Sequence, residues 1–229
     1  MKNKVGLILN AGLTATRLYR GWLKQMGAAD KVSVKLLDYE AIKVALKTMP
    51  ITGPGPLLAP LVAELKAEGC THCAVGCFSL QNHLEELCEG AKICHIGALE
   101  VLEKLVKDEP EHTVIGILGT IQTLFMRTLG GTSIRRGRTL KGIPLVHPYM
   151  ASQMHLTDAI FDRLSQAGPE VRDFDLITRC TKNCIEQGAT VIVVGCTDIG
   201  EACPKAYDGT LFIDLPFLHA KEIARVANE

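Results

Sequence analysis

The sequence has no excess of charge of either sign and no long apolar run. Its 229 residues hold 25 Lys and Arg against 25 Asp and Glu, so a partner selected by strong charge, such as nucleic acid, is not expected. No apolar segment reaches the length of a membrane span. The basic and apolar start is broken at Asn10 and Gly12, before a signal peptide is complete. We therefore expect a globular protein without a nucleic-acid or membrane partner.

The nine cysteines lack the arrangement of a disulfide framework. Their number is odd, and they are scattered through apolar segments of a chain longer than a typical disulfide-stapled domain. This pattern indicates reduced thiols and predicts a cytoplasmic protein. Seven of them are expected to be small buried apolar side chains: Cys70, Cys73, Cys88, Cys94, Cys180, Cys184 and Cys203.

Short runs rich in Val, Ile and Leu alternate with longer amphipathic stretches, which is typical of parallel sheets covered by helices. The runs predict strands at residues 5–9, 32–37, 72–76, 93–96, 114–118, 191–194 and 211–214. The amphipathic stretches predict helices at residues 16–25, 57–68, 83–89, 98–107, 122–129, 151–166, 170–187 and 219–227. The predicted fold class is therefore α/β.

Two pieces of the sequence occur twice in the same order. Glu68–Cys77 aligns with Gln187–Cys196; both segments follow an amphipathic stretch and end in Val-Gly-Cys. The segment that begins at Val5 likewise matches the one at Ile115, since each is an apolar strand that runs into a small polar loop and a helix. The repetition predicts two similar α/β domains, with parallel-type sheets related by pseudo-two-fold symmetry.

The first predicted domain comprises residues 1–97 plus 206–229, and the second comprises residues 98–205. Because ligands bind at the carboxyl ends of strands in open α/β sheets, an active site is expected in the interdomain cleft. Cys77 and Cys196 would then lie on its two sides. Each follows a Gly, which lets backbone or ligand approach closely.

Cys70, His72, Cys73 and Cys77 superficially suggest a metal-ligand cluster. Metal-binding Cys pairs normally occupy turns that wrap an ion, whereas this segment is expected to be a strand. Alternate side chains of a strand point to opposite faces, so Cys70 and Cys73 would diverge. No metal site is therefore predicted.

Several motifs resemble the PLP-independent aspartate/glutamate racemase superfamily, and the resemblance covers nearly the whole chain. The segment "VVGCTDIG" is similar to the family's Gly-Cys-Thr-Glu motif, with Asp198 in place of Glu. The segment "GLILNAGLTAT" resembles the family's opening loop and keeps Gly12 and Thr16. "GILGTIQT" is similar to its Leu-Gly-Thr-x-x-Thr loop, and "LPFLHAKEI" resembles its closing segment, which carries His219.

The first cysteine motif departs from the family pattern. Where the family has Cys-Asn-Thr-x-His, this chain has "CFSLQ", so that Phe78, Ser79 and Gln81 replace Asn, Thr and His. The departure keeps the thiol and one hydroxyl but removes an amide that would bind substrate.

The resemblance implies a cofactor-independent amino-acid racemase, an isomerase of aspartate or glutamate that forms a homodimer. Racemisation removes a proton from one face of a carbon and returns one to the other, so two facing thiols can act as the bases. Cys77 and Cys196 are the predicted catalytic residues. Charge developing on the substrate carboxylate needs fixed N–H and hydroxyl donors. The predicted substrate-binding residues are Asn10, Gly12, Phe78, Ser79, Thr120, Thr123 and Thr197.

Other functions stay open. Phe78 after the first thiol resembles hydantoin racemases, and maleate isomerase or arylmalonate decarboxylase chemistry would use the same fold. A non-catalytic two-lobed protein that binds small molecules is a further alternative. A substrate side-chain carboxylate would need a cation, and the dense basic cluster, which is more often a solvated loop, consists of Arg135, Arg136, Arg138 and Lys141.

Overall fold

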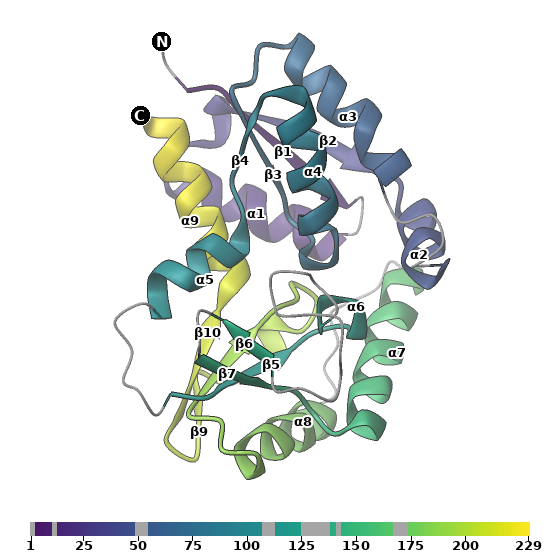
Figure 1. Cartoon of the computed structure of the whole chain (residues 1–229), viewed down its shortest axis with the longest axis vertical. Coiled ribbons are helices and arrows are strands. Elements are labelled where there is room, and N and C mark those ends of the chain that lie inside the picture. The colour runs from purple at the N-terminus through teal and green to yellow at the C-terminus, as the bar shows by residue number, and fades with distance from the viewer. Residues whose placement is uncertain are drawn as a thin grey trace. The chain divides into compact units, whose positions relative to one another are not determined.

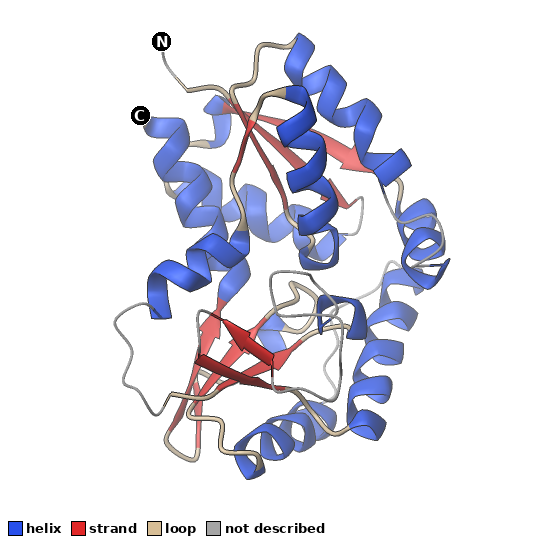
Figure 2. Ribbon diagram, in the orientation of Figure 1, coloured by secondary structure: helices blue, strands red, loops and turns tan. Residues whose placement is uncertain are grey.

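The computed structural model describes residues 3–10, 13–48, 55–106, 113–124, 138–140, 143–166 and 174–229. The chain forms two compact units (Figure 1). One comprises Met1–Glu100 together with Pro216–Glu229, and the other comprises Val101–Leu215. The first unit is thus assembled from both ends of the chain. Each unit is α/β, with strands covered by helices (Figure 2).

The first unit contains a four-stranded parallel sheet in the order β2-β1-β3-β4. Its strands are β1 (Val5–Asn10), β2 (Val32–Leu37), β3 (His72–Val75) and β4 (Cys94–His95). Its helices are α1 (Leu13–Gln25), α2 (Tyr39–Thr48), α3 (Gly55–Ala67), α4 (Gln81–Ala91), the start of α5 (Ala98–Val106) and α9 (Leu215–Asn228), with 3-10 turns η1 (Ala29–Lys31) and η2 (Phe78–Leu80).

Strand β1 is buried along its whole length, which explains why its sequence is a continuous apolar run rather than an alternating one. Leu7 and Leu9 belong to a core cluster with Tyr19 of α1 and Ile223 of α9. Gly6 faces α3 instead, because a Cβ there would lie 2.6 Å from Leu65 Cδ1. The C-terminal helix is therefore part of the core that surrounds the first strand.

The second unit contains a six-stranded sheet in the order β6-β7-β5-β8-β10-β9. The central strands β7, β5, β8 and β10 are parallel, and the edge strands β6 and β9 are antiparallel. Its elements are β5 (Ile115–Leu118), α6 (Ile121–Leu124), β6 (Arg138–Leu140), β7 (Ile143–Val146), α7 (Met150–Gln166), α8 (Phe174–Glu186), β8 (Val191–Val194), η4 (Gly200–Ala202), β9 (Ala206–Tyr207) and β10 (Thr210–Asp214). Leu156, Ile177 and Ile192 lie in its core cluster.

The α/β class with two parallel-type sheets is as predicted, but the second boundary differs from the predicted one. Residues 206–214 were assigned to the first domain. In the structure β10 pairs with β8 in parallel and β9 pairs with β10, so these residues complete the second sheet. The chain returns to the first unit only at Pro216.

Helix α2, the edge strands β6 and β9, and strand β7 beside β6 were not predicted. Strand β6 lies inside the segment that was expected to be a basic loop, and it contains Arg138. The adjacent strand β7 carries Pro144, which pairs opposite Thr139. Proline weakens a strand prediction, yet it is tolerated on strands near a sheet edge. Arg135, Arg136 and Lys141 lie outside the described residues.

Candidate functional site

The first candidate cysteine lies in a loop at the carboxyl edge of the first sheet. Strand β3 ends at Val75, which pairs with Ile8 of β1, and the Gly76 N–H donates to the Ile8 carbonyl at 2.9 Å. Cys77 follows in extended conformation and is half-buried. A Cβ at position 76 would lie 2.5 Å from Leu9 Cδ2, so glycine is needed to seat the loop against β1.

Asn10 ends β1 at the same edge of the sheet. Asn10 is 6% exposed, and its Oδ1 makes no hydrogen bond to the residues that the structure describes. The Thr16 hydroxyl of α1 donates to the Asn10 carbonyl at 2.9 Å and thereby fixes the end of the strand. Because a buried amide oxygen without a partner is unfavourable, Asn10 is available to accept a donor from a ligand.

Gln81 holds the loop that contains Cys77 through two hydrogen bonds to the backbone. It is buried at the start of α4; its Nε2 donates to the Val75 carbonyl at 2.7 Å, and its Oε1 accepts from the Ala98 N–H at 3.3 Å. Phe78 and Ser79 lie between the cysteine and Gln81 and are both buried. Gln81 therefore joins the end of β3 to the start of α5.

The second candidate cysteine lies in an equivalent loop of the second unit. Strand β8 ends at Val194, opposite Leu118 of β5, and the Gly195 N–H donates to the Leu118 carbonyl at 2.7 Å. Cys196 comes next and is half-buried. Its thiol donates to Asp198 Oδ2 at 3.7 Å. This hydrogen bond orients the thiol toward the carboxylate.

Two threonines that follow β5, one in the loop and one in α6, lie beside the Cys196 loop. Thr120 and Thr123 are buried, their hydroxyl oxygens lie 3.3 Å apart, and the Thr123 N–H donates to the Thr120 carbonyl. A Cβ at Gly119 would lie 3.3 Å from the Thr123 hydroxyl and 3.4 Å from the Gly195 carbonyl, which shows how closely the two loops approach. Thr197, beside the cysteine, is also buried.

The two loops have matching backbone geometry within their own units. Just before β3, the strand that leads to Cys77, the Thr71 N–H donates to the Lys4 carbonyl at 2.8 Å. Just before β8, the strand that leads to Cys196, the Thr190 N–H donates to the Val114 carbonyl at 2.9 Å. The helices α3 and α8 that precede these strands each end near a glycine with positive φ, Gly69 at 81° and Gly188 at 92°. Such a turn favours glycine, because a Cβ is strained in the left-handed region.

The structure thus places the predicted site residues in two groups, one in each unit. Asn10, Cys77, Phe78 and Ser79 lie at the carboxyl edge of the first sheet. Thr120, Thr123, Cys196 and Thr197 lie at the carboxyl edge of the second. Gly12 is outside the described residues. Catalytic and substrate-binding roles for these residues remain predictions.

His219 lies inside α9 and is fully buried, although it was expected to begin a helix. Its Nε2 lies 2.9 Å from the Ile96 carbonyl, which only accepts, so this nitrogen carries the proton. The Tyr19 hydroxyl, 2.9 Å from Nδ1, is then the donor to that nitrogen. Burial lowers the pKa of His219 to about 4. Both ring nitrogens have hydrogen-bond partners, so His219 links α9 to α1 and to the backbone at Ile96.

Gln153 supports the second group and was not among the predicted site residues. Gln153 lies in α7 and is fully buried; its Nε2 donates to the Gly119 carbonyl at 2.9 Å. It also contacts Thr157, whose hydroxyl accepts from the Ile121 N–H at 2.9 Å. The signal was present, because Gln153 shares a helix face with Leu156 and Ile160.

The remaining cysteines mostly match their expected packing role. Cys70, Cys73, Cys88, Cys180 and Cys184 are buried, and Cys203 is half-buried. Cys94 is exposed, so its expected burial was wrong: it lies on the short strand β4 at the edge of the sheet. Burial raises the pKa of the Cys184 and Cys203 thiols to about 12. These two are therefore poor acid/base groups at neutral pH.

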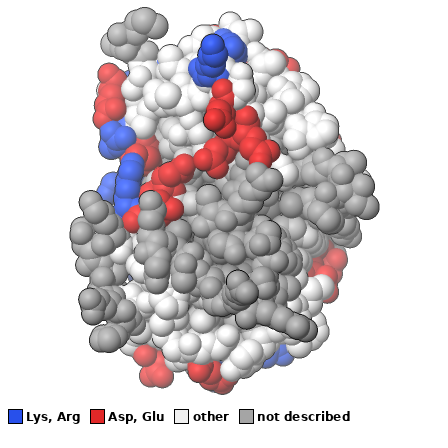
Figure 3. All heavy atoms as spheres, viewed as in Figure 1, with Lys and Arg blue, Asp and Glu red and all other residues white. Residues whose placement is uncertain are grey.

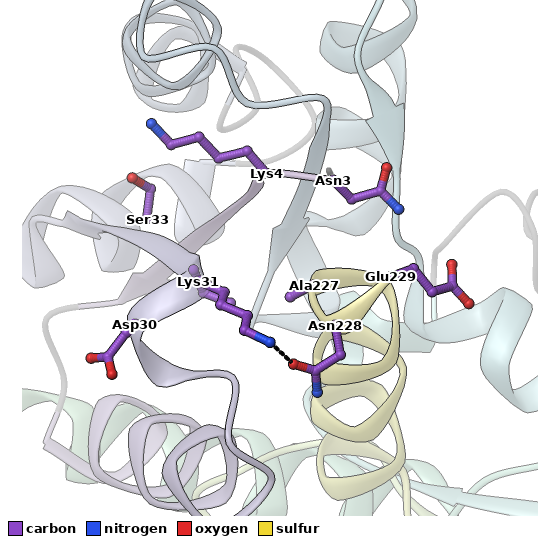
Figure 4. Close-up of a pocket in the computed structure, with 9 residues that line it drawn as sticks. Asn3, Lys4, Asp30, Lys31, Ser33, Ala227, Asn228 and Glu229 are labelled. Carbon is purple, nitrogen blue, oxygen red and sulfur yellow. Dashed lines mark hydrogen bonds between the residues drawn. The ribbon is translucent and has the colours of Figure 1, made fainter. Parts of the chain in front are cut away.

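A pocket of about 390 Å³ lies elsewhere in the first unit (Figure 4). It is lined by Lys4, Lys31, Ser33 and Asn228, and Lys31 Nζ donates to Asn228 Oδ1 at 2.6 Å. These residues surround the amino ends of β1 and β2. Asn10 and Cys77 follow the carboxyl ends, where ligands bind in parallel sheets, so this pocket is separate from the candidate site.

Solved structures of similar fold were compared with the chain. A candidate Asp/Glu racemase from Yersinia pestis matches with a TM-score of 0.78 at 18% identity, covering 99% of this chain and 100% of the other. An aspartate racemase homologue from Pyrococcus horikoshii gives 0.72 at 16%, covering 100% of both. Aspartate racemase from Picrophilus torridus gives 0.68 at 13%, covering 99% and 95%. At these identities the likeness establishes the fold.

The Asp/Glu/hydantoin racemase family matches residues 5–223. The chain belongs to this family, which confirms the resemblance seen in its motifs. Racemases are isomerases, so the expected class of enzyme is also confirmed. Comparison with curated proteins finds no match. Among the described residues, no helix has both the length and the apolar character needed to cross a membrane.

Proposed function

We propose that the chain is a cofactor-independent amino-acid racemase in which Cys77 and Cys196 exchange the α-proton of an acidic amino acid. One observation carries the proposal: both thiols follow a glycine whose N–H is bonded to the neighbouring strand, Gly76 to Ile8 and Gly195 to Leu118. The same loop is therefore built twice, with a half-buried thiol at the same place each time.

In the proposed reaction one thiolate removes the α-proton and becomes a thiol. The other thiol then delivers its proton to the opposite face of the carbanion and becomes a thiolate, so the enzyme ends with the two protonation states exchanged. Exchange of one proton from the new thiol to water and of one proton from water to the new thiolate resets them, and the hydrogen bond to Asp198 Oδ2 orients the Cys196 thiol. The mechanism requires the two thiols to face one substrate carbon.

Charge on the carbanion would be met by short polar groups beside the thiols. Asn10 and Ser79 are proposed for the first unit, and Thr120, Thr123 and Thr197 for the second. All are less than 9% exposed, and donors held in a dry setting stabilise developing charge more strongly than water does. As part of the same proposal, the enzyme is a cytoplasmic homodimer.

A hydantoin is the second candidate substrate, and Phe78 is the observation that favours it. A buried phenyl ring stands directly after Cys77, where an amide would offer hydrogen bonds to an amino-acid substrate. Loss of that polar group is compatible with a cyclic, less charged ligand.

Proton exchange in D₂O distinguishes these possibilities. The purified protein is incubated without added PLP or metal with both enantiomers of aspartate, glutamate and a 5-substituted hydantoin, and loss of the α-proton is followed by NMR. An enzyme-free sample corrects for spontaneous exchange. Exchange of an acidic amino acid with inversion supports the main proposal. Binding without exchange of any substrate would instead favour a non-catalytic binding protein.

The Cys77→Ser and Cys196→Ser variants test the two thiols. Each should lower the rate of inversion by at least about 10²-fold, the smaller end of the usual contribution of a positioned acid or base. The matched control is Cys94→Ser, since Cys94 is exposed on β4 and outside the proposed machinery. Circular dichroism verifies folding. A wild-type rate of inversion in either the Cys77→Ser or the Cys196→Ser variant would refute the two-thiol mechanism.

A further inference from the structure

Three side chains of the first unit, outside the proposed catalytic groups, bring ligand atoms of metal-binding type together. Glu85 of α4, His95 of β4 and Glu100 of α5 each offer one nitrogen or carboxylate oxygen, and these atoms lie within 4.8 Å of one another. Acidic side chains gather over α4 and α5 on this face of the unit (Figure 3). Exposed acidic groups are common on proteins, so the cluster alone does not indicate a ligand.

His95 supplies the independent observation. Its side chain is 10% exposed, and both ring nitrogens are buried and make no hydrogen bond to any residue that the structure describes. Nδ1 lies 3.7 Å from Glu100 Oε1, which is within ion-pair distance when the imidazole is protonated but beyond hydrogen-bond distance. In the same unit His219 has a partner at each nitrogen. A buried imidazole directed at two carboxylates and left unsatisfied is a side chain prepared for a ligand.

Gly97 makes room for the third member of the cluster. A Cβ at position 97 would lie 1.6 Å from Glu100 Oε2, so any larger residue would displace this carboxylate. The glycine at position 97 therefore leaves the space that the Glu100 carboxylate occupies beside the imidazole.

We propose that Glu85, His95 and Glu100 bind a divalent transition-metal ion such as Zn²⁺. An imidazole with two carboxylates suits zinc and its first-row neighbours, whereas Mg²⁺ and Ca²⁺ prefer oxygen ligands alone. Metal–ligand bonds of about 2.0–2.2 Å require ligand atoms to lie about 3–4 Å apart. The two exposed glutamates can close the remaining distance by rotation of their side chains, and water completes the coordination.

The ion would have a structural role, since it joins α4, β4 and α5 within one unit. Nothing in this inference depends on racemase activity. Binding to the folded state alone should raise the midpoint of thermal unfolding as the metal concentration rises. A cysteine variant that has lost proton exchange should still bind the metal. Failure of the racemase proposal can therefore be told apart from failure of the metal proposal.

The test titrates Co²⁺ into untagged protein that has been treated with a chelator and dialysed. We expect one ion per chain, weak visible d–d absorption and no intense thiolate-to-cobalt band, together with a higher unfolding midpoint. Isothermal titration with Zn²⁺ gives the affinity. Binding weaker than about 1 mM, or a strong thiolate band at the first equivalent, would overturn the proposal.

Variants locate the ion. His95→Ala, Glu85→Gln and Glu100→Gln should each weaken binding by more than about 10-fold, the loss that even an outer-shell partner produces. Glu89→Gln is the matched control, because Glu89 is exposed one turn further along α4. Its affinity should be unchanged. Equal affinity of the His95→Ala variant and the wild type would place the ion elsewhere.

Gly97→Ala keeps all three proposed ligands, so it tests the site even if the His95→Ala variant fails to fold. Its methyl group should push the flexible end of Glu100 away, with little effect on folding, and so weaken Co²⁺ binding. Unaltered binding in this variant would show that the carboxylate does not hold the ion, and would contradict the proposed ligand set.

Discussion

His219 shows how strongly the surroundings of one residue decide its role. It lies in a segment similar to the family's closing motif. In the structure its two nitrogens connect α9 to Tyr19 of α1 and to the carbonyl of Ile96. With a pKa of about 4, the imidazole is neutral near pH 7 and holds this pair of bonds in one tautomer.

The low pKa of His219 predicts a pH dependence of stability. The unfolded chain takes up a proton below its ordinary pKa of about 6.5, whereas the folded chain does so only near 4, so the unfolded state is favoured as pH falls between these values. The loss is on the order of 3 kcal/mol across the window. Urea unfolding at several pH values should show this loss in the wild type and a smaller one in His219→Gln.

Neighbouring titratable groups, among them His95, Glu100 and Glu222, are present in both proteins. The comparison therefore isolates the contribution of the imidazole. A His219→Gln variant with the same pH dependence as the wild type would show that another group is responsible.

The sequence could predict the positions of Cys77 and Cys196 but not what supports them. The cysteines were found because the repeated Val-Gly-Cys segments are continuous in sequence. The roles of Gln81 and Gln153 depend on backbone groups that distant elements supply, the Ala98 N–H for Gln81 and the Gly119 carbonyl for Gln153. No local pattern encodes such a pairing, and roles of this kind emerge only from the folded structure.

At the scale of elements, the repeated glycines set how closely a helix packs on each sheet. Gly6 of β1 faces Leu65 of α3, and Gly116 of β5 faces Cys184 of α8 and Ile192 of β8. A Cβ at Gly116 would lie 2.9 Å from Cys184 Cβ, an atom fixed to the backbone, whereas at Gly6 it would meet only the flexible end of Leu65. The two positions are equivalent in the repeat, but their surroundings differ.

Alanine substitutions should expose this difference. Gly116→Ala is expected to lower the free energy of unfolding by about 2–3 kcal/mol and Gly6→Ala by about 1 kcal/mol, within the usual range for overpacking. Gly21→Ala is the control: Gly21 is exposed inside α1 with open space around it, so alanine should stabilise by about 0.5–1 kcal/mol. Urea unfolding measures all three. Equal losses at positions 6 and 116 would contradict the packing argument.

The central strands were predictable because both of their faces are buried, which leaves a continuous apolar run. The edge elements were not. Strand β9 has two residues and β6 has three, too few for a periodic signal, and they exist because a neighbouring strand offers unpaired backbone groups. Strand β10 was predicted as a strand but was assigned to the first domain, whereas it pairs with β8 in the second sheet. The sequence of a strand does not specify which strand it pairs with.

At the scale of the whole molecule, each unit has its own core cluster. Leu7 and Ile223 belong to one, and Leu156 and Ile192 to the other. The chain's only tryptophan, Trp22, packs against the first cluster. Tryptophan fluorescence therefore reports the first unit alone, while far-UV circular dichroism reports both.

This arrangement predicts that core substitutions act on one unit at a time. Leu7→Ala should destabilise by about 2–5 kcal/mol and shift the urea transition seen by fluorescence. Ile192→Ala should cause a similar loss in circular dichroism and leave the fluorescence midpoint nearly unchanged. If Ile192→Ala shifts both signals together, the two units unfold as a single cooperative body and the prediction is wrong.

The split first unit also has a consequence for synthesis on the ribosome. Its core includes Ala220, Ile223 and Ala224 of α9, which are translated more than a hundred residues after β1. The second unit is continuous in sequence, so all of its strands emerge before α9 does. Leu7 and Leu9 therefore lack their final neighbours until α9 has been translated, and α9 then completes the core around a strand that was made much earlier.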